Sequence, residues 1–264
     1  MKIEKVIETF IQCPNCGKEE TQLISGDGRA ICYKCNYVFA KEGENVPKEM
    51  WKEKDVDAIR CDKCNELIPL IPDNMRTYEK PAPVLLCPHR SYCNDSEDKF
   101  VMHAIAIHYE KHWFPPAYFL TKESEDSINE ATDLRDKITL YILNTRAMSE
   151  DTESAFRDVS DDIYTSKIFW LDNKAIGYYT YTKPSEYENV PVLRQVFVEK
   201  EYRRKGYATK MLKDFLMLFP EGDVTIDSPS RAFLKLLLKE KEVRVNEKRE
   251  VESTGRLRFR RPRM

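Results

Sequence analysis

The sequence predicts an α+β fold, in which a mixed, mainly antiparallel sheet flanked by helices follows two small cysteine-rich modules. Three observations predict it. All eight cysteines lie between Cys13 and Cys93, so the chain divides into a cysteine-rich first part and a cysteine-free remainder. After about residue 115, apolar side chains alternate between strand and helix spacing. The composition, 41% hydrophobic and 11% aromatic, is sufficient to bury a core and excludes a disordered chain.

Length and charge bound the domain organisation and the partners. With 264 residues the chain exceeds one average domain, and we expect modules at residues 1–45 and 46–98 and a larger domain at residues 99–264. The formal net charge of −2 provides no global field that attracts nucleic acid or anionic lipid. No run of 18 apolar residues occurs, and the first residues carry acids where a signal peptide needs an apolar core. A cytoplasmic protein with no membrane partner is therefore expected.

Cysteine spacing predicts two metal sites. Six cysteines form C-x2-C pairs, a spacing that directs two thiolates at one tetrahedral zinc ion. In a chain with no secretory signal, disulfides are the less favoured interpretation. Two structural zinc ions are therefore expected. The predicted ligands are Cys13, Cys16, Cys32 and Cys35 for the first ion and Cys61, Cys64, Cys87 and Cys93 for the second.

The fourth ligand of the second site has two candidates. Cys93 completes a closed set of four cysteines, and His89 competes with it. His89 follows Cys87 by only two residues and would close a tight chelate ring, so Cys93 is preferred. A polar, charged connection at residues 40–57 joins the two sites, with a short helix predicted around Met50 and Trp51.

A hairpin is predicted between the first two cysteine pairs, because the Gly26-Asp27-Gly28 turn stands between short apolar stretches. A segment this small needs the metal to fold. With C-x2-C-G, a Ser-x-Asp-Gly turn and C-Y-x-C, residues 10–39 resemble the zinc ribbon at the N-terminus of phage replicative primases. The resemblance implies DNA or RNA as a partner.

Charge and aromatic residues leave that partner open. Residues 1–100 hold 15 Lys and Arg against 18 Asp and Glu, whereas phosphate binding usually shows a basic surface. Tyr33, Tyr37 and Phe39 either stack on unpaired bases, as in single-strand binders, or pack the small core of the ribbon. Packing is the favoured alternative.

Helical spacing of apolar residues predicts a helix over residues 96–113, ended by Pro115 and Pro116. His108 and His112 would share one face of this helix. The glutamate of the H-E-x-x-H zinc motif is absent, so both histidines are interpreted as ordinary polar positions.

The cysteine-free part alternates strands and helices. A strand is predicted at residues 117–120, and a capping box at residues 127–130 predicts the start of a long amphipathic helix. The remaining predicted elements are a hairpin at residues 168–171 and 175–181, a strand at 192–198, a helix at 207–218, a strand at 224–226 and a helix at 232–238.

The loop between strand 192–198 and helix 207–218 carries a recognisable motif. Arg203, Gly206 and Ala208 satisfy the pattern Gln or Arg, two residues, Gly, any residue, then Gly or Ala. With the order of strands and helices around it, this loop resembles the coenzyme A loop of the GNAT superfamily N-acetyltransferases, over about residues 115–264. The resemblance implies a GNAT-like sheet, acetyl-CoA as cosubstrate and acetyl transfer to an amine acceptor.

The chemistry of the loop explains the residue types. Small residues at 206 and 208 let successive backbone N–H groups at a helix N-terminus approach a pyrophosphate. Three neighbouring basic side chains add cationic charge. The resemblance further implies that a backbone N–H near Val198 holds the thioester oxygen. The expected cofactor-binding residues are Val196, Phe197, Val198, Arg203, Arg204, Lys205, Gly206, Tyr207, Ala208 and Thr209.

The catalytic residues are less determined, because the sequence departs from the family pattern. Arg194 stands near the place where many relatives carry a strand glutamate. The candidate general bases are Glu186, Glu188 and Glu199, with Glu188 preferred. Leu236 stands near the position of the tyrosine that protonates the leaving thiolate in many relatives. Ser228 or Ser230 either bonds the sulfur or caps the following helix, and capping is the favoured role.

The C-terminus is the one dense basic segment, with nine basic against four acidic side chains in residues 241–264. Leu257 and Phe259 alternate with arginines, which predicts a final edge strand that can also contact phosphate. The leading functional hypothesis is an acetyl-CoA-dependent N-acetyltransferase acting on a primary amine, whose zinc modules recruit the acceptor. The alternative is a non-catalytic zinc-dependent adaptor for nucleic acid or protein.

Overall fold

A computed structural model covers the whole chain. It describes all residues except 20–22, 25–29, 33–34, 41–45, 72–73, 77–80, 89–103, 124, 151–155, 157, 160–162, 186–188, 221–222, 240–243, 246–256 and 261–264. The chain divides into a first unit, residues 1–75 and 87–92, and a second unit, residues 76–86 and 93–264. Among the described residues, no helix is both long and apolar enough to cross a membrane.

The first unit contains two small antiparallel sheets. A long two-stranded ribbon pairs β1 (Ile3–Ile11) with β5 (Trp51–Arg60), and β6 (Leu67–Pro69) extends it at the end of β5. The second sheet lies between the first two cysteine pairs and consists of β2 (Leu23–Ile24), β3 (Ala30–Ile31) and β4 (Val38–Ala40). The hairpin predicted between these pairs is confirmed. The helix expected around Met50 is a single 3-10 turn, η1 (Lys48–Met50), and Trp51 already belongs to β5.

A four-stranded sheet follows, in the order β10 (His112–Phe114), β9 (Ala104–Tyr109), β8 (Val84–Leu86) and β7 (Met75–Arg76). The helix predicted up to residue 113 is therefore wrong for residues 104–113. Glu110 and Lys111 both have left-handed φ angles, 47° and 69°, and form a tight hairpin turn. His108 and His112 lie on neighbouring strands, where His108 faces Trp113 in register.

Two further predictions near residue 120 are wrong. Residues 117–120 do not form a strand, because α2 (Pro116–Phe119) begins there with a proline in its first turn. The predicted capping box is part of a strand, β11 (Ser127–Glu130). The long helix, α3 (Leu134–Glu150), starts later, where the Asp133 carboxylate accepts a hydrogen bond of 2.7 Å from the Asp136 N–H.

The seven-stranded sheet of the second unit confirms the predicted mixed, mainly antiparallel arrangement. Among the described strands of this sheet, only β14 and β15 pair in parallel, and α4 (Tyr207–Leu218) connects them. The basic C-terminal strand forms, but it lies between β15 and β16, so the prediction that it is the edge strand is wrong. The order is β11, β12 (Thr165–Leu171), β13 (Lys174–Thr182), β14 (Val192–Val198), β15 (Val224–Ile226), β17 (Leu257–Arg260) and β16 (Arg244–Val245).

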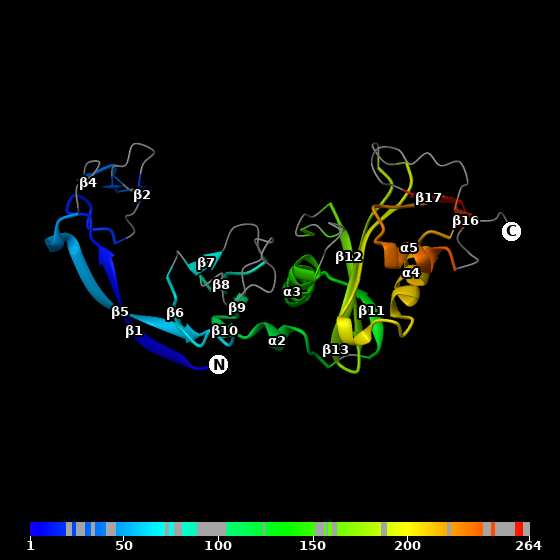
Figure 1. Cartoon of the computed structure of the whole chain (residues 1–264), viewed down its shortest axis with the longest axis horizontal. Coiled ribbons are helices and arrows are strands. Elements are labelled where there is room, and N and C mark those ends of the chain that lie inside the picture. The colour runs from blue at the N-terminus through cyan, green and yellow to red at the C-terminus, as the bar shows by residue number, and fades with distance from the viewer. Residues whose placement is uncertain are drawn as a thin grey trace. The chain divides into compact units, whose positions relative to one another are not determined.

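Helices cover both faces of this sheet (Figure 1). On one face α3 packs through Leu140 and Leu143 against Trp170, Tyr178 and Phe197. On the other face lie α4 and α5 (Arg231–Leu237). The apolar side chains that these two helices bury there are Met211, Leu212, Phe215, Leu216 and Leu237. The sheet is therefore the middle layer of three.

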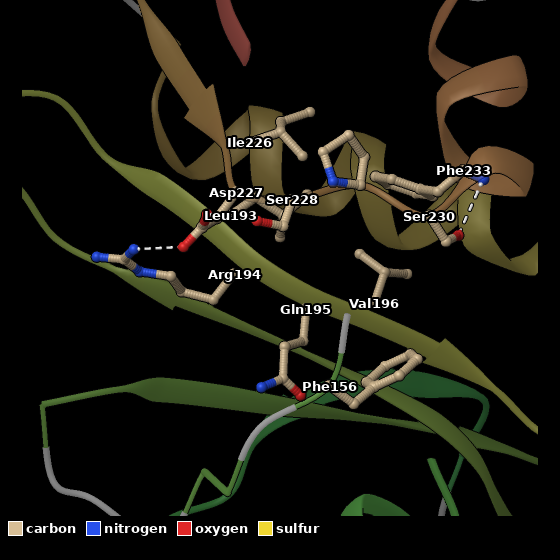
Figure 2. A pocket seen from close by; sticks show the side chains of 11 residues that line it. Phe156, Leu193, Arg194, Gln195, Val196, Ile226, Asp227, Ser228, Ser230 and Phe233 are labelled. Carbon is tan, nitrogen blue, oxygen red and sulfur yellow. Dashed lines mark hydrogen bonds and ion pairs between the residues drawn. The ribbon is translucent and has the colours of Figure 1, made fainter. Parts of the chain in front are cut away.

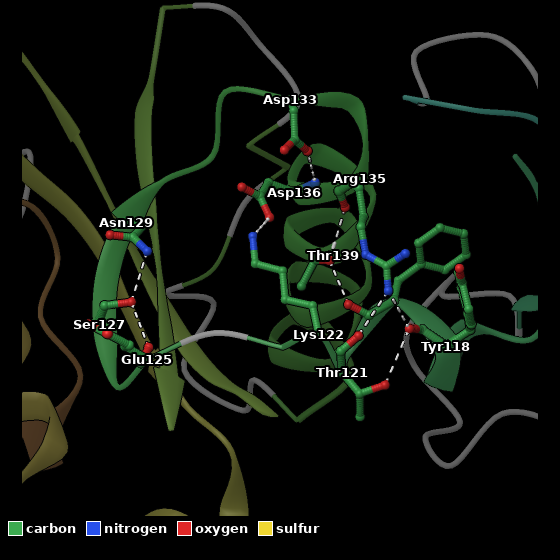
Figure 3. Close-up of polar contacts among 11 residues, drawn as sticks. Tyr118, Thr121, Lys122, Glu125, Ser127, Asn129, Asp133, Arg135, Asp136 and Thr139 are labelled. Atoms are coloured by element: carbon green, nitrogen blue, oxygen red, sulfur yellow. Dashed lines mark hydrogen bonds and ion pairs between the residues drawn. The ribbon is translucent and has the colours of Figure 1, made fainter. Parts of the chain in front are cut away.

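Polar contacts fix the first turns of α3 to the segment before it (Figure 3). The Arg135 guanidinium donates to the carbonyls of Tyr118 and Thr121, at 3.1 and 2.9 Å. Lys122 reaches Asp136 at 2.6 Å, and this ion pair is largely buried. The segment around α2 is thereby held on the helix that lines one face of the sheet.

Candidate functional site

Three cysteines of the first unit begin the same turn. In each turn the cysteine N–H donates to the carbonyl five residues later, at 2.9, 2.8 and 2.9 Å for Cys13, Cys32 and Cys61. The carbonyl of each cysteine accepts from the N–H four residues later, at 2.8, 2.8 and 3.0 Å. The residue four positions after the cysteine has a left-handed φ in each turn, and these residues are Gly17, Asn36 and Asn65 respectively. The shared turn directs both sulfurs of a C-x2-C pair to one side.

The first cluster brings four cysteine sulfurs within 4.8 Å of one another. The Sγ atoms of Cys13 and Cys35 are 3.6 Å apart, and those of Cys16 and Cys32 are 3.7 Å apart. A disulfide would need about 2.05 Å. A tetrahedral zinc ion with bonds of about 2.3 Å places its sulfurs about 3.8 Å apart, which the cluster matches. The cluster is therefore able to hold a metal ion.

Hydrogen bonds to one sulfur of this cluster, that of Cys35, favour its thiolate form. The pKa of the Cys35 thiol is lowered to about 6, chiefly by a hydrogen bond with the Asn15 side chain and then by one from the Tyr37 N–H. Donors around a metal-bound sulfur orient it and stabilise its charge.

The second cluster brings together Cys61, Cys64 and Cys87, with 3.6 Å between the Sγ atoms of Cys64 and Cys87. His89 and Cys93, the two candidates for its fourth ligand, lie outside the described residues, so that choice stays a prediction. Tyr33 also lies outside them. Tyr37 is at the surface, with 37% of its area exposed.

In the second unit, the predicted cofactor loop joins β14 to α4 through η3 (Lys200–Tyr202). Gly206 is the N-cap of α4 with a φ of 84°, and Arg204 also has a left-handed φ, 63°. No side chain caps the helix, and a Cβ added at Gly206 would meet nothing within 4 Å. The positive end of α4 therefore lacks a side-chain cap, and the space beside Gly206 is open, which fits the approach of a pyrophosphate to the first N–H groups of the helix.

The basic side chains of this loop differ in their contacts. Arg203 donates through Nε to the Val198 carbonyl at 2.8 Å and through a terminal nitrogen to Glu150 at 2.5 Å. Arg203 thereby fixes the loop to β14 and to the end of α3. Arg204 and Lys205 are exposed.

Beside this loop, β14 and β15 separate. They pair only at Val192 with Thr225 and at Leu193 with Ile226, and the last main-chain bond runs from the Asp227 N–H to the Leu193 carbonyl at 2.9 Å. A pocket opens where the strands diverge (Figure 2). It is lined by Phe156, Leu193, Arg194, Gln195, Val196, Ile226, Asp227, Ser228, Pro229, Ser230 and Phe233.

A β-bulge determines which side chains face this pocket. The pairing of β13 with β14 skips Arg194, because Thr180 faces Gln195 and Tyr181 faces Leu193. As a result, Leu193 packs in the cluster under α4 and α5, whereas Gln195 bonds to the α3 side. Phe156 packs on the α3 side too, so the pocket is lined from both faces of the sheet.

Two polar features of the pocket were not singled out from the sequence. Arg194 forms an ion pair with Asp227 at 2.7 Å, visible in Figure 2, and both side chains are only 15% exposed. Gln195 accepts a hydrogen bond of 2.9 Å from the Tyr178 hydroxyl. A charged residue directly after the short apolar strand 224–226 was the available signal for Asp227.

The predicted catalytic residues are distributed unevenly. Ser228 lines the pocket, and its hydroxyl lies 3.1 Å from the Asp227 carboxylate. Ser230 caps α5 by accepting from the Phe233 N–H at 3.3 Å, as the favoured alternative predicted. Glu199 forms an ion pair with Arg146 at 2.6 Å and is not among the residues that line the pocket. Glu186 and Glu188 lie outside the described residues.

With this geometry, residues 128–234 match the model of the acetyltransferase (GNAT) family. The fold is GNAT-like. ElaA of Escherichia coli is similar at 12% identity, with a TM-score of 0.41, over 52% of this chain and 100% of that one. An acyl-CoA N-acyltransferase from Pseudomonas aeruginosa is similar at 16% identity, with a TM-score of 0.41, over 52% and 99%. YhbS of E. coli, in complex with CoA, is similar at 15% identity, with a TM-score of 0.39, over 53% and 84%.

Proposed function

We propose that this protein is an acetyl-CoA-dependent N-acetyltransferase that acts on a primary amine. One observation carries the proposal: the pocket between the diverging strands β14 and β15 lies on the strand that leads directly into the uncapped N-terminus of α4. One continuous segment, β14 with the loop that leads into α4, thus carries both the anion site and the pocket. Such a pair of sites suits a phosphate-containing cosubstrate on one face and an acceptor on the other.

Strand alternation supports the predicted role of the β14 backbone. The Glu199 N–H bonds to the Ile176 carbonyl at 2.8 Å, so position 199 points toward β13. Because alternate residues of a strand point to opposite neighbours, the N–H groups of Val198 and Val196 point to the side where β15 has diverged. We assign to them the hydrogen bonds that hold the cosubstrate and its thioester oxygen, where charge develops during attack by the amine.

The pyrophosphate is assigned to the start of α4. The N–H groups of Tyr207, Ala208 and Thr209 would hold it, with Gly206 leaving the approach open and Arg204 and Lys205 adding charge. Phe197 and Arg203 support the loop, since the guanidinium lies 5.6 Å from the centre of the Phe197 ring and bonds to the backbone.

Proton removal is assigned to a carboxylate of the loop before β14. Glu188 is the preferred base and Glu186 the second choice, because Glu199 is ion-paired and does not line the pocket. Only a neutral amine has the lone pair that attacks the thioester carbonyl, so the rate should rise with pH as the ammonium or the carboxylate loses its proton. Ser228 is assigned to the leaving sulfur.

The first unit is proposed to bind two structural zinc ions and to recruit the acceptor. The cysteine clusters support the metal assignment by their sulfur spacing. DNA or RNA is the proposed recruiting partner, and the exposed Tyr37 ring supports it as a stacking surface. The full-length chain should then bind single-stranded nucleic acid in a salt-sensitive manner, and Tyr37→Ser should weaken that binding.

Isothermal titration with acetyl-CoA tests the cosubstrate site. We expect Gly206→Glu to abolish binding while the chain stays folded, because the change adds bulk and negative charge at an exposed position. Glu201→Gln serves as the control, because it changes an exposed side chain of η3 in the same loop. Unchanged affinity in a folded Gly206→Glu protein would contradict the assignment.

A second candidate is an adaptor that binds coenzyme A without catalysis. Leu236 favours it, because this side chain packs against the apolar core where relatives carry the tyrosine acid. Release of free thiol from acetyl-CoA in the presence of amines separates the two functions. Binding of acetyl-CoA with no release of free thiol in the presence of any amine would favour the adaptor.

A further inference from the structure

The long ribbon of the first unit, β1 with β5 (Figure 1), has one exposed face. Along β1, alternate residues from Ile3 to Thr9 are exposed, and the residues between them are partly buried. Because directly paired residues of two strands lie on the same face, the exposed face continues across β5. We call this surface the ribbon face. Its exposed residues are Ile3, Lys5, Ile7 and Thr9 of β1 and Trp51, Glu53, Asp55 and Asp57 of β5.

Large apolar side chains are accessible on the ribbon face. The exposed fraction is 67% for Ile7, 49% for Ile3 and 40% for Trp51. Ile7 pairs across the ribbon with Asp55, so its direct cross-strand neighbour is a carboxylate and not an apolar side chain. Accessible apolar area that is bordered by charges is typical of a surface that binds a partner.

The charges of the ribbon face are mostly negative. Its three acids occupy every second position of β5, and Lys5 pairs with one of them, Asp57, at 2.7 Å. Glu53 and Asp55 form no ion pair within the described part of the chain. Lys54 stands between them in sequence and therefore alternates to the other face of the ribbon. Phosphate groups would be repelled by this surface, so nucleic acid is disfavoured as its occupant.

A lysine side chain complements both the apolar and the acidic groups. Its methylene stem lies well on apolar surface while its ammonium group stays at the charged boundary. Stems that lie on Ile3 and Ile7 would bring ammonium groups toward the carboxylates of the neighbouring strand, which is about 4.8 Å away. The exposed Trp51 ring offers a further site for a cation. In an extended segment, alternate side chains repeat about every 7 Å, which matches the spacing of the acids along β5.

We propose that the ribbon face binds an extended, lysine-rich segment of a partner protein. The inference goes beyond the proposed acetyltransferase function and does not depend on it, because binding is measured without acetyl-CoA. It also concerns a surface other than that of Tyr37, which directly precedes β4 and does not belong to the ribbon.

A labelled peptide of alternating Lys and Ser, about twelve residues long, is the probe, and the full-length protein is titrated against it by fluorescence anisotropy. We expect a Kd on the order of 100 µM or tighter at low salt. A peptide of alternating Glu and Ser should not bind. At 0.5 M salt the affinity for the lysine peptide should fall but not vanish, because salt screens the charges and not the apolar contacts.

A charge variant tests the acids. Glu53→Gln combined with Asp55→Asn keeps the shape of both side chains and should weaken peptide binding about fivefold at low salt, with the loss shrinking at 0.5 M salt. Glu66→Gln combined with Glu123→Gln is the matched control, because it removes the same charge at exposed positions outside the ribbon face. The control should change the affinity by less than about twofold.

An apolar variant tests the stems. Ile7→Thr keeps a β-branched side chain, so the strand should persist, and it should weaken binding about threefold at both salt concentrations. Ile163→Thr is the matched control, because Ile163 is 69% exposed and belongs to the second unit. It should leave the affinity unchanged. Far-ultraviolet circular dichroism checks that each variant is folded.

Several outcomes would overturn the inference. These are no binding of the lysine peptide at about 1 mM, an equal loss in either control variant, and full affinity in folded Ile7→Thr. Binding of a single-stranded oligothymidylate that Ile7→Thr weakens would assign the ribbon face to nucleic acid instead. A dimer of the unmodified protein that Ile7→Thr dissociates would assign it to a second copy of the chain.

Discussion

The first cysteine cluster and the second unit of the chain differ in how much apolar volume they bury. Around the first cysteine cluster, the buried residues are Ile11, Cys13 and Cys32, with a few partly buried neighbours such as Val46 and Met50. The second unit, residues 76–86 and 93–264, is called the GNAT-like unit below. It buries large side chains almost completely, and these include Trp170, Tyr178, Tyr179, Phe119 and Phe215. The residues around the first cysteine cluster bury little apolar volume, so the proposed metal ion would have to supply there the stability that packing supplies in the larger fold.

Metal removal should produce the largest difference in stability between the two units. A chelator should unfold the cysteine modules and leave the GNAT-like unit folded, because structural zinc supplies about 10–16 kcal/mol in small zinc peptides. Amide hydrogen exchange on the full chain measures both units at once. Protection should be lost in β1 to β6 and retained in β12 to β14.

A cysteine variant sharpens this test. Cys32→Ser should release the first ion only and leave the cluster of Cys61, Cys64 and Cys87 metal-bound, since no described cysteine belongs to both clusters. Metal analysis should then find half the metal content of the unmodified chain. Loss of protection in the GNAT-like unit after either treatment would contradict the division.

Two glycines of the GNAT-like unit test the role of packing. A Cβ at Gly177 would lie 2.3 Å from the Phe197 carbonyl oxygen and 2.9 Å from Met211, so Gly177→Ala should lower the free energy of unfolding by about 3 kcal/mol or more. Gly206→Ala meets no atom but keeps a left-handed φ, and it should cost only about 1 kcal/mol. Urea unfolding of both variants measures the difference, and the reverse ranking would show that packing at Gly177 relaxes.

The same contrast explains what the sequence could predict. The cysteine turns depend on a few adjacent residues, and their spacing was sufficient to group the ligands. The hairpin at residues 168–171 and 175–181 was predicted, and its turn contains Asp172 and Asn173, residue types that tolerate left-handed φ angles, here 49° and 62°. Glu110 and Lys111 adopt the same geometry without any such signal, so the hairpin they form was predicted as a helix.

The pocket was harder to predict, because it depends on contacts distant in sequence. The loop at Gly206 was identifiable from its own residues. The bulge at Arg194 follows from the register of β14 against β13, and this register decides that Gln195 faces α3. Nothing in the local sequence pairs Arg194 with Asp227, since β14 and β15 are joined through α4.

A buried polar contact in the GNAT-like unit should have a smaller effect than packing. The Tyr179 hydroxyl bonds to Asp214, which also pairs with Lys167 at 2.6 Å. Burial, and then the hydrogen bond with Asp214, raise the pKa of Tyr179 well above its usual range. Folding therefore keeps this hydroxyl protonated where the unfolded chain would ionise.

The resulting stability is fully present below pH about 10, the ordinary pKa of tyrosine, and is lost as the pH rises beyond it. Tyr179→Phe should remove this part of the pH dependence and cost about 1 kcal/mol at neutral pH. Urea unfolding at pH 8 and pH 10.5 compares the two proteins. If the free energy of unfolding fell equally between these pH values in the unmodified protein and in Tyr179→Phe, the assignment to Tyr179 would be contradicted.

The smallest effect on stability is expected at the ion pair of Arg203 with Glu150, whose side chains are 42% and 33% exposed. Glu150→Gln should change the free energy of unfolding by less than about 1 kcal/mol, because exposed ion pairs are screened by water and salt. Its effect on acetyl-CoA should be larger, since it removes a negative charge beside the loop assigned to the pyrophosphate. We expect the affinity to rise about threefold at low salt and the gain to shrink at 0.5 M salt. Titration at both salt concentrations checks this, and weaker binding by Glu150→Gln would show that the contact of Glu150 with Arg203 holds the loop in its binding conformation.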